Sequence, residues 1–228
     1  MRDAFRSACL IAAGLFVAGN SNAQQMEGWP EWLKEAMATE SKKLKTAEFE
    51  IEAGPYQFTL PKETGGPNAF DGGWYFESQI GSDAVLECYI FSGDNDLATL
   101  TNNLADISLQ TTADANGGKL DNKSVFALDA GHLEGSPYLS IEWIYTVGEA
   151  PNALVGHTKV SAASNGELTQ ACSHTALGFR ETFKNSFATF VLSAQQPAPA
   201  VEPYYEELAL QKLDGQPIGT AQLSYTLD

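Results

Sequence analysis

The chain has 228 residues, of which 29 are acidic and 13 are lysine or arginine, so its formal net charge is −16 at pH 7. This excess of negative charge repels phosphate backbones and argues against nucleic-acid binding. The length, together with 43% hydrophobic residues, is enough for one domain with its own core.

The first residues follow the pattern of a secretory signal peptide. Arg2 and Arg6 precede a short apolar run, and small residues lead to Ala23, after which a signal peptidase would cut before Gln24. The run is too short to cross a bilayer, which needs about 20 apolar residues. We therefore expect 1–23 to be removed, leaving a periplasmic or secreted bacterial protein with no stable membrane insertion. An uncleaved N-terminal anchor is the alternative.

The spacing of apolar residues predicts an amphipathic helix over 28–44. Trp29 and Trp32 lie on its apolar stripe, and Pro30 suits a first helical turn. The two tryptophans either cover the domain's own sheet or form a surface for a partner, and both interpretations stay open.

Alternating apolar and polar residues predict strands over 47–54, 56–61, 72–81 and 83–93. Residues 64–73, TGGPNAFDGG, fit neither a strand period nor a helix period and are predicted to form a loop. Because loops often carry binding residues, Phe70, Trp74 and Tyr75 near this segment are candidates for a binding surface.

A second helix is predicted over 94–110. Its apolar residues are spaced by three or four positions and are expected to share one face: Leu97, Leu100, Leu104 and Ile107. Asp94 or Asp96 can cap the first turn by accepting free amide protons. Residues 92–97, SGDNDL, also resemble the start of a calcium-binding loop, but the glutamate that closes such a loop is missing.

Four more strands are predicted over 124–135, 136–148, 152–164 and 166–174. The last two form a hairpin, for which Asn165-Gly166 predicts a type I′ turn. One face of the second strand is expected to be apolar: Leu139, Ile141, Trp143, Tyr145 and Val147. Ser140 and Glu142 are placed on the opposite, polar face.

The last predicted helix covers 178–194. It carries one continuous apolar stripe: Phe179, Phe183, Phe187, Phe190 and Val191. A Pro/Ala-rich linker follows over 195–203 and ends the predicted domain of 24–194. Residues 204–228, which begin with Tyr204 and Tyr205, predict a terminal hairpin that either adds to the sheet edge or binds a partner by strand addition.

Successive hairpins imply an antiparallel sheet with helices packed on it, which is an α+β fold. The segment YQFTLP, a Trp-containing strand, a helix, a meander and a Phe-rich final helix resemble the PsbP/Mog1-like α/β/α sandwich group over roughly 45–194. The resemblance implies a sandwich fold and accessory or assembly roles, and it supplies no catalytic residues.

Cys88 and Cys172 are the only cysteines that remain after signal cleavage. An even pair in an oxidising compartment usually forms a disulfide, and both residues are in phase with apolar strand neighbours. The alternatives are two buried free thiols, or a reactive Cys172 thiolate beside His174 and a helix start. No third orienting group stands at a recognisable spacing for such a site.

The remaining residues do not point to catalysis. His132, His157 and His174 each stand alone in or at the end of a different strand, so we expect no metal and no cofactor. We expect a non-enzymatic accessory module that binds another envelope protein through the 64–75 region, the Trp29 helix or the terminal hairpin. The alternatives are a periplasmic carrier of a small apolar ligand, or a hydrolase or metalloenzyme whose site the sequence does not reveal.

Overall fold

The fold is given by a computed structural model, which describes residues 30–37, 44–52, 56–81, 84–149, 153–194 and 205–225. The helices in these residues are α2 (Glu31–Met37), α3 (Leu97–Ala115) and α4 (Arg180–Ser193). The strands before α3 are β1 (Thr46–Glu50), β2 (Gln57–Pro61), β3 (Thr64–Phe70), β4 (Gly73–Gln79) and β5 (Val85–Ser92). The strands after it are β6 (Leu120–Leu133), β7 (Ser136–Val147), β8 (Leu154–Ser164), β9 (Leu168–His174), β10 (Tyr205–Leu213) and β11 (Gln216–Tyr225).

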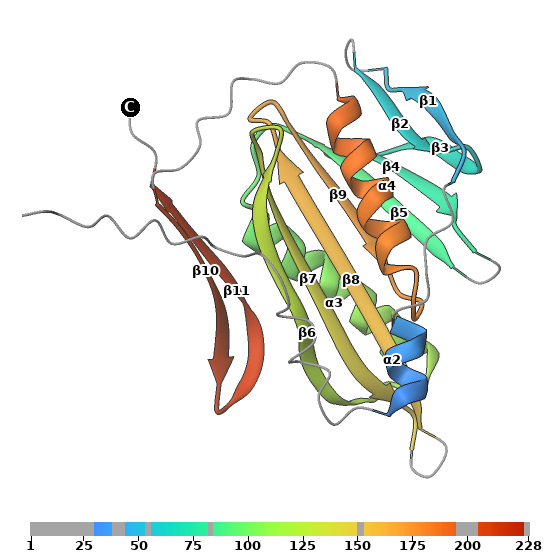
Figure 1. Cartoon of the computed structure of the whole chain (residues 1–228), viewed down its shortest axis with the longest axis vertical. Coiled ribbons are helices and arrows are strands. Elements are labelled where there is room, and N and C mark those ends of the chain that lie inside the picture. The colour runs from blue at the N-terminus through green and yellow to red at the C-terminus, as the bar shows by residue number, and fades with distance from the viewer. Residues whose placement is uncertain are drawn as a thin grey trace, which may run out of the picture.

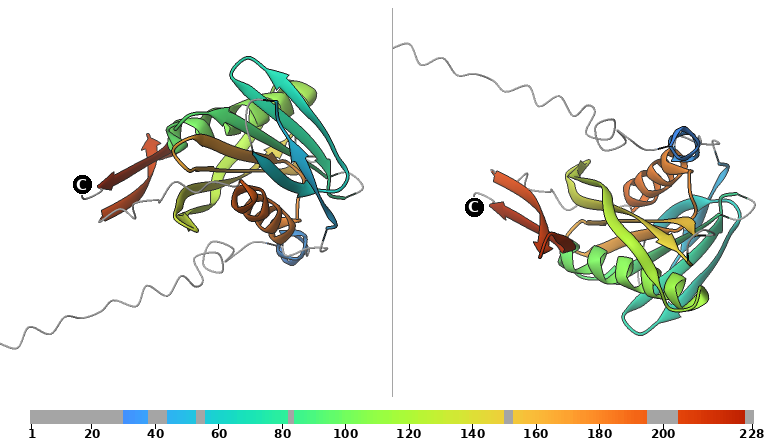
Figure 2. Two further views of the ribbon diagram at one scale, coloured as in Figure 1. Left: turned by 90° about the horizontal axis from the view of Figure 1, so that it is seen from above. Right: turned by 90° about the horizontal axis from the view of Figure 1, so that it is seen from below.

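Seven of these strands form one antiparallel sheet in the order β3-β4-β5-β9-β8-β7-β6. Helix α4 lies across one face of this sheet and α3 across the other (Figures 1 and 2). Strands β1 and β2 form a separate two-stranded sheet, and β10 and β11 form another. The predicted α+β fold, with helices packed on an antiparallel sheet and a C-terminal hairpin, is confirmed.

The alternation of β7 explains why α3 packs on one face of the sheet. Its five predicted apolar residues belong to the core cluster beneath α3: Leu139, Ile141, Trp143, Tyr145 and Val147. Gly156 on β8 pairs with Tyr145, and a Cβ atom at this glycine would lie 2.1 Å from the tyrosine ring. Glycine therefore stands where the neighbouring strand's ring needs the space.

A second core cluster lies beneath α4. Phe183, Phe187 and Phe190 of the helix pack with sheet residues and with Phe58 of β2, which confirms most of the predicted phenylalanine stripe. Phe179 differs because it precedes the helix with φ of 56°, in the left-handed region, and its ring packs against His174.

A disulfide joins Cys88 on β5 to Cys172 on β9, as the sequence predicted. The two residues are directly paired across the strands, and both are fully buried. Within the seven-stranded sheet, every other neighbouring pair of strands is also consecutive in the chain, whereas β5 and β9 are not. The disulfide therefore fastens the one strand pairing in this sheet that has no short connection.

The prediction of a loop over 64–73 is wrong, because Thr64–Phe70 forms β3. This strand pairs with β4 at the edge of the sheet, with a shift of register between Gly65 and Asn68. Proline and glycine are tolerated on edge strands and at bulges, where a ladder hydrogen bond is not needed. Pro67 therefore hid a strand that the apolar periodicity alone did not reveal.

The hairpin of β8 and β9 is confirmed, but its predicted type I′ turn is wrong. Asn165 does not have the positive φ that such a turn requires, whereas Gly166 does. Instead the Asn165 side-chain oxygen accepts hydrogen bonds from the backbone N–H groups of Glu167 and Leu168, at 3.0 and 2.9 Å. The asparagine side chain thus closes the turn, as asparagine commonly does.

The terminal hairpin packs on α3 and does not extend the main sheet. Asn102 of α3 exchanges two hydrogen bonds of 3.3 Å with Thr220 of β11. Gly219 allows this approach, since a Cβ atom there would lie 3.2 Å from the Asn102 side chain. Leu208 of β10 packs against the core cluster beneath α3.

Helix α2 docks near the far end of β7. Leu33 is buried with Phe126 and Ile144, whereas Trp32 remains 57% exposed. None of the helices in the described ranges is long and apolar enough to cross a membrane. The predicted signal peptide and the predicted linker at 195–203 lie outside those ranges.

Candidate functional site

Four aromatic side chains gather on the α3 side of strands β3, β4 and β5. We call them the aromatic face: Phe70, Tyr75, Tyr89 and Phe91. Strand pairing brings them together, because Tyr75 is paired with Tyr89, and Gly73 is paired with both Phe70 and Phe91. Directly paired residues of antiparallel strands point to the same side of a sheet.

The rings of the aromatic face form one contiguous patch. Tyr89 and Phe91 stack with centroids 6.1 Å apart, and Tyr75 lies 6.3 Å from Tyr89. Phe70 meets Phe91 edge-on at 5.7 Å. Phe70 is 38% exposed, and the other three rings are half-buried.

The described helices make their main contacts with other strands. Helix α3 packs on β7, β8 and β9, and α4 packs mainly on β2 and β9. The aromatic face is therefore a part of the sheet surface that neither helix is centred on.

A pocket of about 170 Å³ lies where the aromatic face meets α3. Glu87, Tyr89 and Ser173 line it from the sheet, and Leu104 and Ile107 line it from the helix. The Tyr89 hydroxyl donates a hydrogen bond to Glu87 Oε2 at 3.0 Å, and the Ser173 hydroxyl donates to the same oxygen at 3.4 Å. The pocket thus combines a carboxylate, hydroxyl groups and an apolar wall.

Ile107 is 63% exposed, which contradicts the prediction that it shares the buried face of its helix. The buried positions of α3 run through Leu97, Thr101, Leu104 and Ala105, so the core-facing stripe is displaced from the one drawn through the large apolar residues alone. This displacement leaves Ile107 on the wall of the pocket.

The environment of Tyr89 keeps its phenol protonated, so the hydroxyl can donate a hydrogen bond. Burial raises the pKa of Tyr89 well above its ordinary value, and the negative charge of Glu87 beside it raises the pKa further. The phenol therefore remains protonated at any ordinary pH and continues to donate to the Glu87 carboxylate.

The structure brings two of the predicted binding residues together and separates the others. Phe70 and Tyr75 belong to the aromatic face, but Trp74 pairs with Ile90 and packs against the core on the α4 side. Trp32 is exposed on α2, away from this face. Sequence patterns missed Tyr89 and Phe91, because the alternation that marks a strand does not tell which face a helix leaves open.

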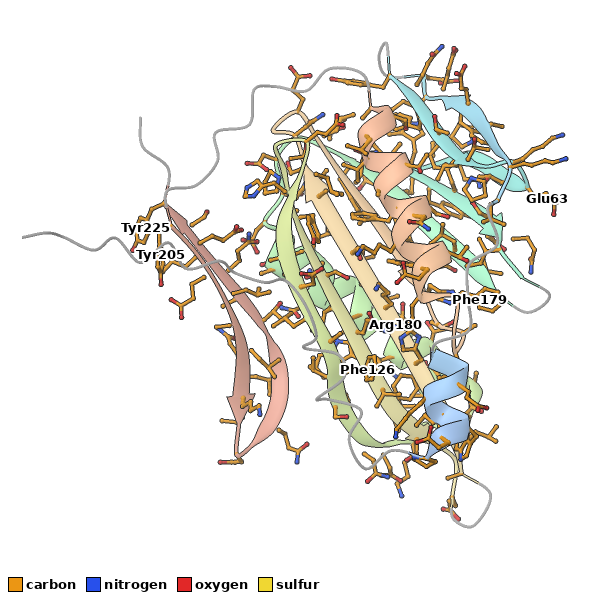
Figure 3. The ribbon with its side chains drawn as sticks, viewed as in Figure 1. Glu63, Phe126, Phe179, Arg180, Tyr205 and Tyr225 are labelled. Carbon is orange, nitrogen blue, oxygen red and sulfur yellow. A yellow bond between two sulfur atoms is a disulfide. The ribbon has the colours of Figure 1, made fainter. Side chains whose placement is uncertain are left out.

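The remaining predicted binding residues belong to the terminal hairpin or to the undescribed segments. Tyr205 lies beside Tyr225 at the end of the hairpin, with the ring centroids 5.9 Å apart and the rings tilted by 43° (Figure 3). Trp29 and Tyr204 lie outside the described residues.

A buried cluster of charged side chains lies on the opposite side of the sheet, beneath the start of α4. Glu142 on β7 is at its centre, with 3% of its side chain exposed. Lys159 Nζ donates to Glu142 Oε1 at 2.7 Å, and Arg180 donates to both carboxylate oxygens at 2.8 and 2.9 Å. His157 Nε2 lies 3.3 Å from Glu142 Oε2. The alternation of β7 predicted that Glu142 lies on a polar strand face, but it did not reveal that the start of α4 covers this residue.

Opposing effects act on the Glu142 carboxyl. Burial alone would raise its pKa, but the hydrogen bond with His157 and the charges of Lys159 and Arg180 together hold the pKa far below its usual range. Arg180 also lies 5.0 Å from the Phe126 ring centre (Figure 3). The carboxylate is thus ionised and fully engaged, which makes this cluster a structural element of the sheet–helix contact.

The three histidines lie on three different strands, as predicted, but strand pairing brings two of them near each other. His157 and His174 have ring centroids 6.3 Å apart, on neighbouring strands under α4. His174 Nδ1 lies 3.0 Å from the Val85 carbonyl oxygen, which can only accept, so this nitrogen is the donor. In the described ranges, no three His, Cys, Asp or Glu side chains are grouped closely enough to hold a metal ion.

Stability is expected to depend on pH through His174. Burial lowers the pKa of His174 from 6.5, and the neighbouring His157 and Lys159 add repulsion, against the Val85 carbonyl that favours the charged form. The unfolded chain gains a proton at this position as pH falls through about 6.5, before the folded chain does. The free energy of unfolding should therefore decrease as pH falls below about 6.5.

The variant His174→Asn tests this dependence, because asparagine can still donate to the Val85 carbonyl but does not titrate. Urea unfolding at a series of pH values should show a shallower loss of stability with acid for the variant than for the wild type. An unchanged slope in the variant would contradict the assignment.

Neither a protein-family model nor a curated protein matches the sequence. Among solved structures, the chain is similar to cyanobacterial PsbP (CyanoP) from Synechocystis, with 18% identity and a TM-score of 0.42 over 67% of this chain and 92% of that one. It is also similar to LpqN, described as involved in cell envelope biogenesis of Mycobacterium tuberculosis, with 10% identity and a TM-score of 0.33 over 68% of this chain and 90% of that one. A protein of Bacteroides thetaiotaomicron has 9% identity and a TM-score of 0.35, over 69% of this chain and 50% of its own.

These likenesses concern the fold alone and carry no argument about function. The resemblance to the PsbP type that the sequence predicted is confirmed at that level, as structural similarity with low sequence identity.

Proposed function

We propose that the chain is an exported accessory module that binds another envelope protein through the aromatic face. Export is supported by the N-terminal signal pattern and by the Cys88–Cys172 disulfide, because disulfides persist mainly in oxidising compartments. The proposal needs no reactive group on the surface, since binding energy comes from apolar and aromatic area removed from water.

The aromatic face is the observation that carries this proposal. Contiguous apolar patches on single domains commonly mark interaction sites, and aromatic residues are enriched at the centres of protein interfaces. Here, four rings from three strands form one set of ring contacts that includes the exposed Phe70, and one of the four, Tyr89, also lines the pocket. Burying such rings is the usual source of the strongest contributions to protein binding.

The pocket favours a protein partner over an apolar ligand held inside the domain. Its volume of about 170 Å³ is smaller than the roughly 300–1,000 Å³ of sites that enclose drug-sized ligands. It lies next to the aromatic face, so a partner that covers the rings would cover the pocket as well.

The buried charge cluster also fits a role in packing better than one in catalysis. The two carboxylate oxygens of Glu142 are occupied by His157, Lys159 and Arg180, and the side chain of His157 is fully buried. A general base must reach a substrate proton directly or through one water, and these groups reach one another instead.

Site-specific photocrosslinking in the native cell envelope tests the proposal. A photoreactive phenylalanine analogue is placed at position 70, 32 or 225, one in each of the three candidate surfaces. Phe70, Trp32 and Tyr225 are all exposed aromatic residues, by 38%, 57% and 57%, so the two control positions are more accessible than position 70. We expect a discrete protein adduct from position 70 and none from the other two. Failure of position 70 to form an adduct would refute the aromatic face as the interface.

A further inference from the structure

We infer that the pocket beside the aromatic face receives a lysine or arginine side chain of the protein partner. This inference deepens the proposed function and rests on it. The pocket lies between strands β5 and β9 and helix α3, and its chemistry selects for positive charge.

The pocket has the size and shape to hold the end of one long side chain. Its volume of about 170 Å³ corresponds to about six water molecules of the liquid. Leu104 and Ile107 give an apolar wall that suits the methylene stem of a basic residue, since such stems bury well while the charged end stays polar. The hydroxyl of Ser108 on α3 and that of Ser173 on β9 offer acceptors for its N–H groups.

The negative charge in the pocket has no partner of opposite charge. Glu87 takes part in none of the ion pairs found among the described residues, and its hydrogen-bond donors are the neutral hydroxyls of Tyr89 and Ser173. Glu77 is directly paired with Glu87 on the neighbouring strand, so two like charges stand side by side on this face. Like charges opposite each other destabilise a strand pair, and a cation between them would relieve this.

When a partner covers the pocket, the charge of the side chain that enters it determines whether the complex is stable. A partner that buries the aromatic face also removes Glu87 from water, and burying an unpaired carboxylate is strongly unfavourable. A neutral or acidic side chain would leave that charge unpaired, whereas an ammonium or guanidinium group would pair with it. The Tyr89 ring adds an electron-rich face that attracts a cation. The net charge of −16 also favours encounter with a basic surface.

The test is a titration of the purified protein with N-acetyl-lysine methylamide, followed by NMR of the backbone amides. We expect saturable shifts at Glu87, Tyr89 and Ser173. The analogue with an acetylated side-chain nitrogen, which is uncharged, should bind at least about tenfold more weakly. The variant Glu87→Gln should weaken binding of the cationic probe by about tenfold or more.

The matched control is Glu77→Gln, which removes the same charge from the paired strand position but does not line the pocket. It should weaken binding of the probe clearly less than Glu87→Gln does, because Glu77 adds to the negative field at the pocket without lining it. Equal binding of the charged and neutral probes, or an equal loss in Glu77→Gln and Glu87→Gln, would overturn the inference. The probe contains no partner protein, so this result is independent of the crosslinking result at position 70.

Discussion

Replacing Glu142 with glutamine is expected to destabilise the fold by about 3 kcal/mol. The substitution removes the charge that balances Lys159 and Arg180, and breaking one member of a buried ion pair leaves uncompensated charge at a cost of roughly 3–5 kcal/mol. We expect the lower end of this range of costs, because Lys159 and Arg180 keep 11% and 18% of their side chains exposed and can turn partly toward water. Urea denaturation gives the change directly as a shift of the midpoint at constant slope.

The control for Glu142→Gln is Glu48→Gln on β1. Glu48 is exposed and forms none of the ion pairs found in the described residues, so its replacement should change stability by about 0.5 kcal/mol or less. A loss below about 1 kcal/mol in Glu142→Gln would show that the cluster is solvated, against its burial under α4.

Removing the disulfide is expected to cost about 4 kcal/mol. The double variant Cys88→Ala/Cys172→Ala opens a loop whose ends are 84 residues apart. In the chain-entropy description, a disulfide stabilises a protein by lowering the entropy of its unfolded chain, and this effect increases with the length of the loop. The loss should be concentrated in the pairing of β5 with β9, since no short connection holds these strands together. Urea denaturation with and without a reductant measures it.

A second cross-strand pair supplies the control for the disulfide. Ser140 and Ser161 are directly paired on β7 and β8 and share a hydrogen bond of 2.8 Å, also on the α4 side. The variant Ser140→Ala/Ser161→Ala should lose only about 1 kcal/mol, as a single hydrogen bond would. The reductant should destabilise the wild type and leave the double cysteine variant unchanged. An equal response of both proteins would show that the disulfide does not stabilise the fold.

Features set by local pattern were predictable from the sequence. The alternation of β7 predicted the face beneath α3, and the phenylalanine spacing predicted the buried face of α4. The disulfide was predictable because Cys88 and Cys172, the two cysteines outside the predicted signal peptide, both follow the apolar phase of a strand, and it indicated in turn that β5 and β9 are neighbours.

Features that depend on which strands become neighbours were not predictable. Glu142 looks like a solvent-facing strand residue until α4 covers it and the pairing of β7 with β8 brings Lys159 beside it. Likewise, Tyr75 and Tyr89 become one surface only through the pairing of β4 with β5. Strand β3 was missed because its Gly-Pro sequence is acceptable only at the edge position that the folded sheet gives it.

The two sides of the sheet differ in how completely their side chains are covered by helices. On the α4 side, charged and aromatic groups are buried where the helix packs on the sheet, as Glu142 and Phe183 are. On the α3 side, the helix is centred on β7, β8 and β9, and the aromatic rings of β3, β4 and β5 stay partly open. The proposed binding role therefore uses the part of the sheet on which neither helix is centred.

Photocrosslinking from positions 70, 32 and 225 in the native envelope is the most direct test of that role. We expect one dominant protein adduct from position 70 on the aromatic face, and we expect it to be lost when Tyr75 is changed to serine in the same chain. An adduct that forms from Trp32 on α2 or from Tyr225 on the hairpin, with none from position 70, would contradict it.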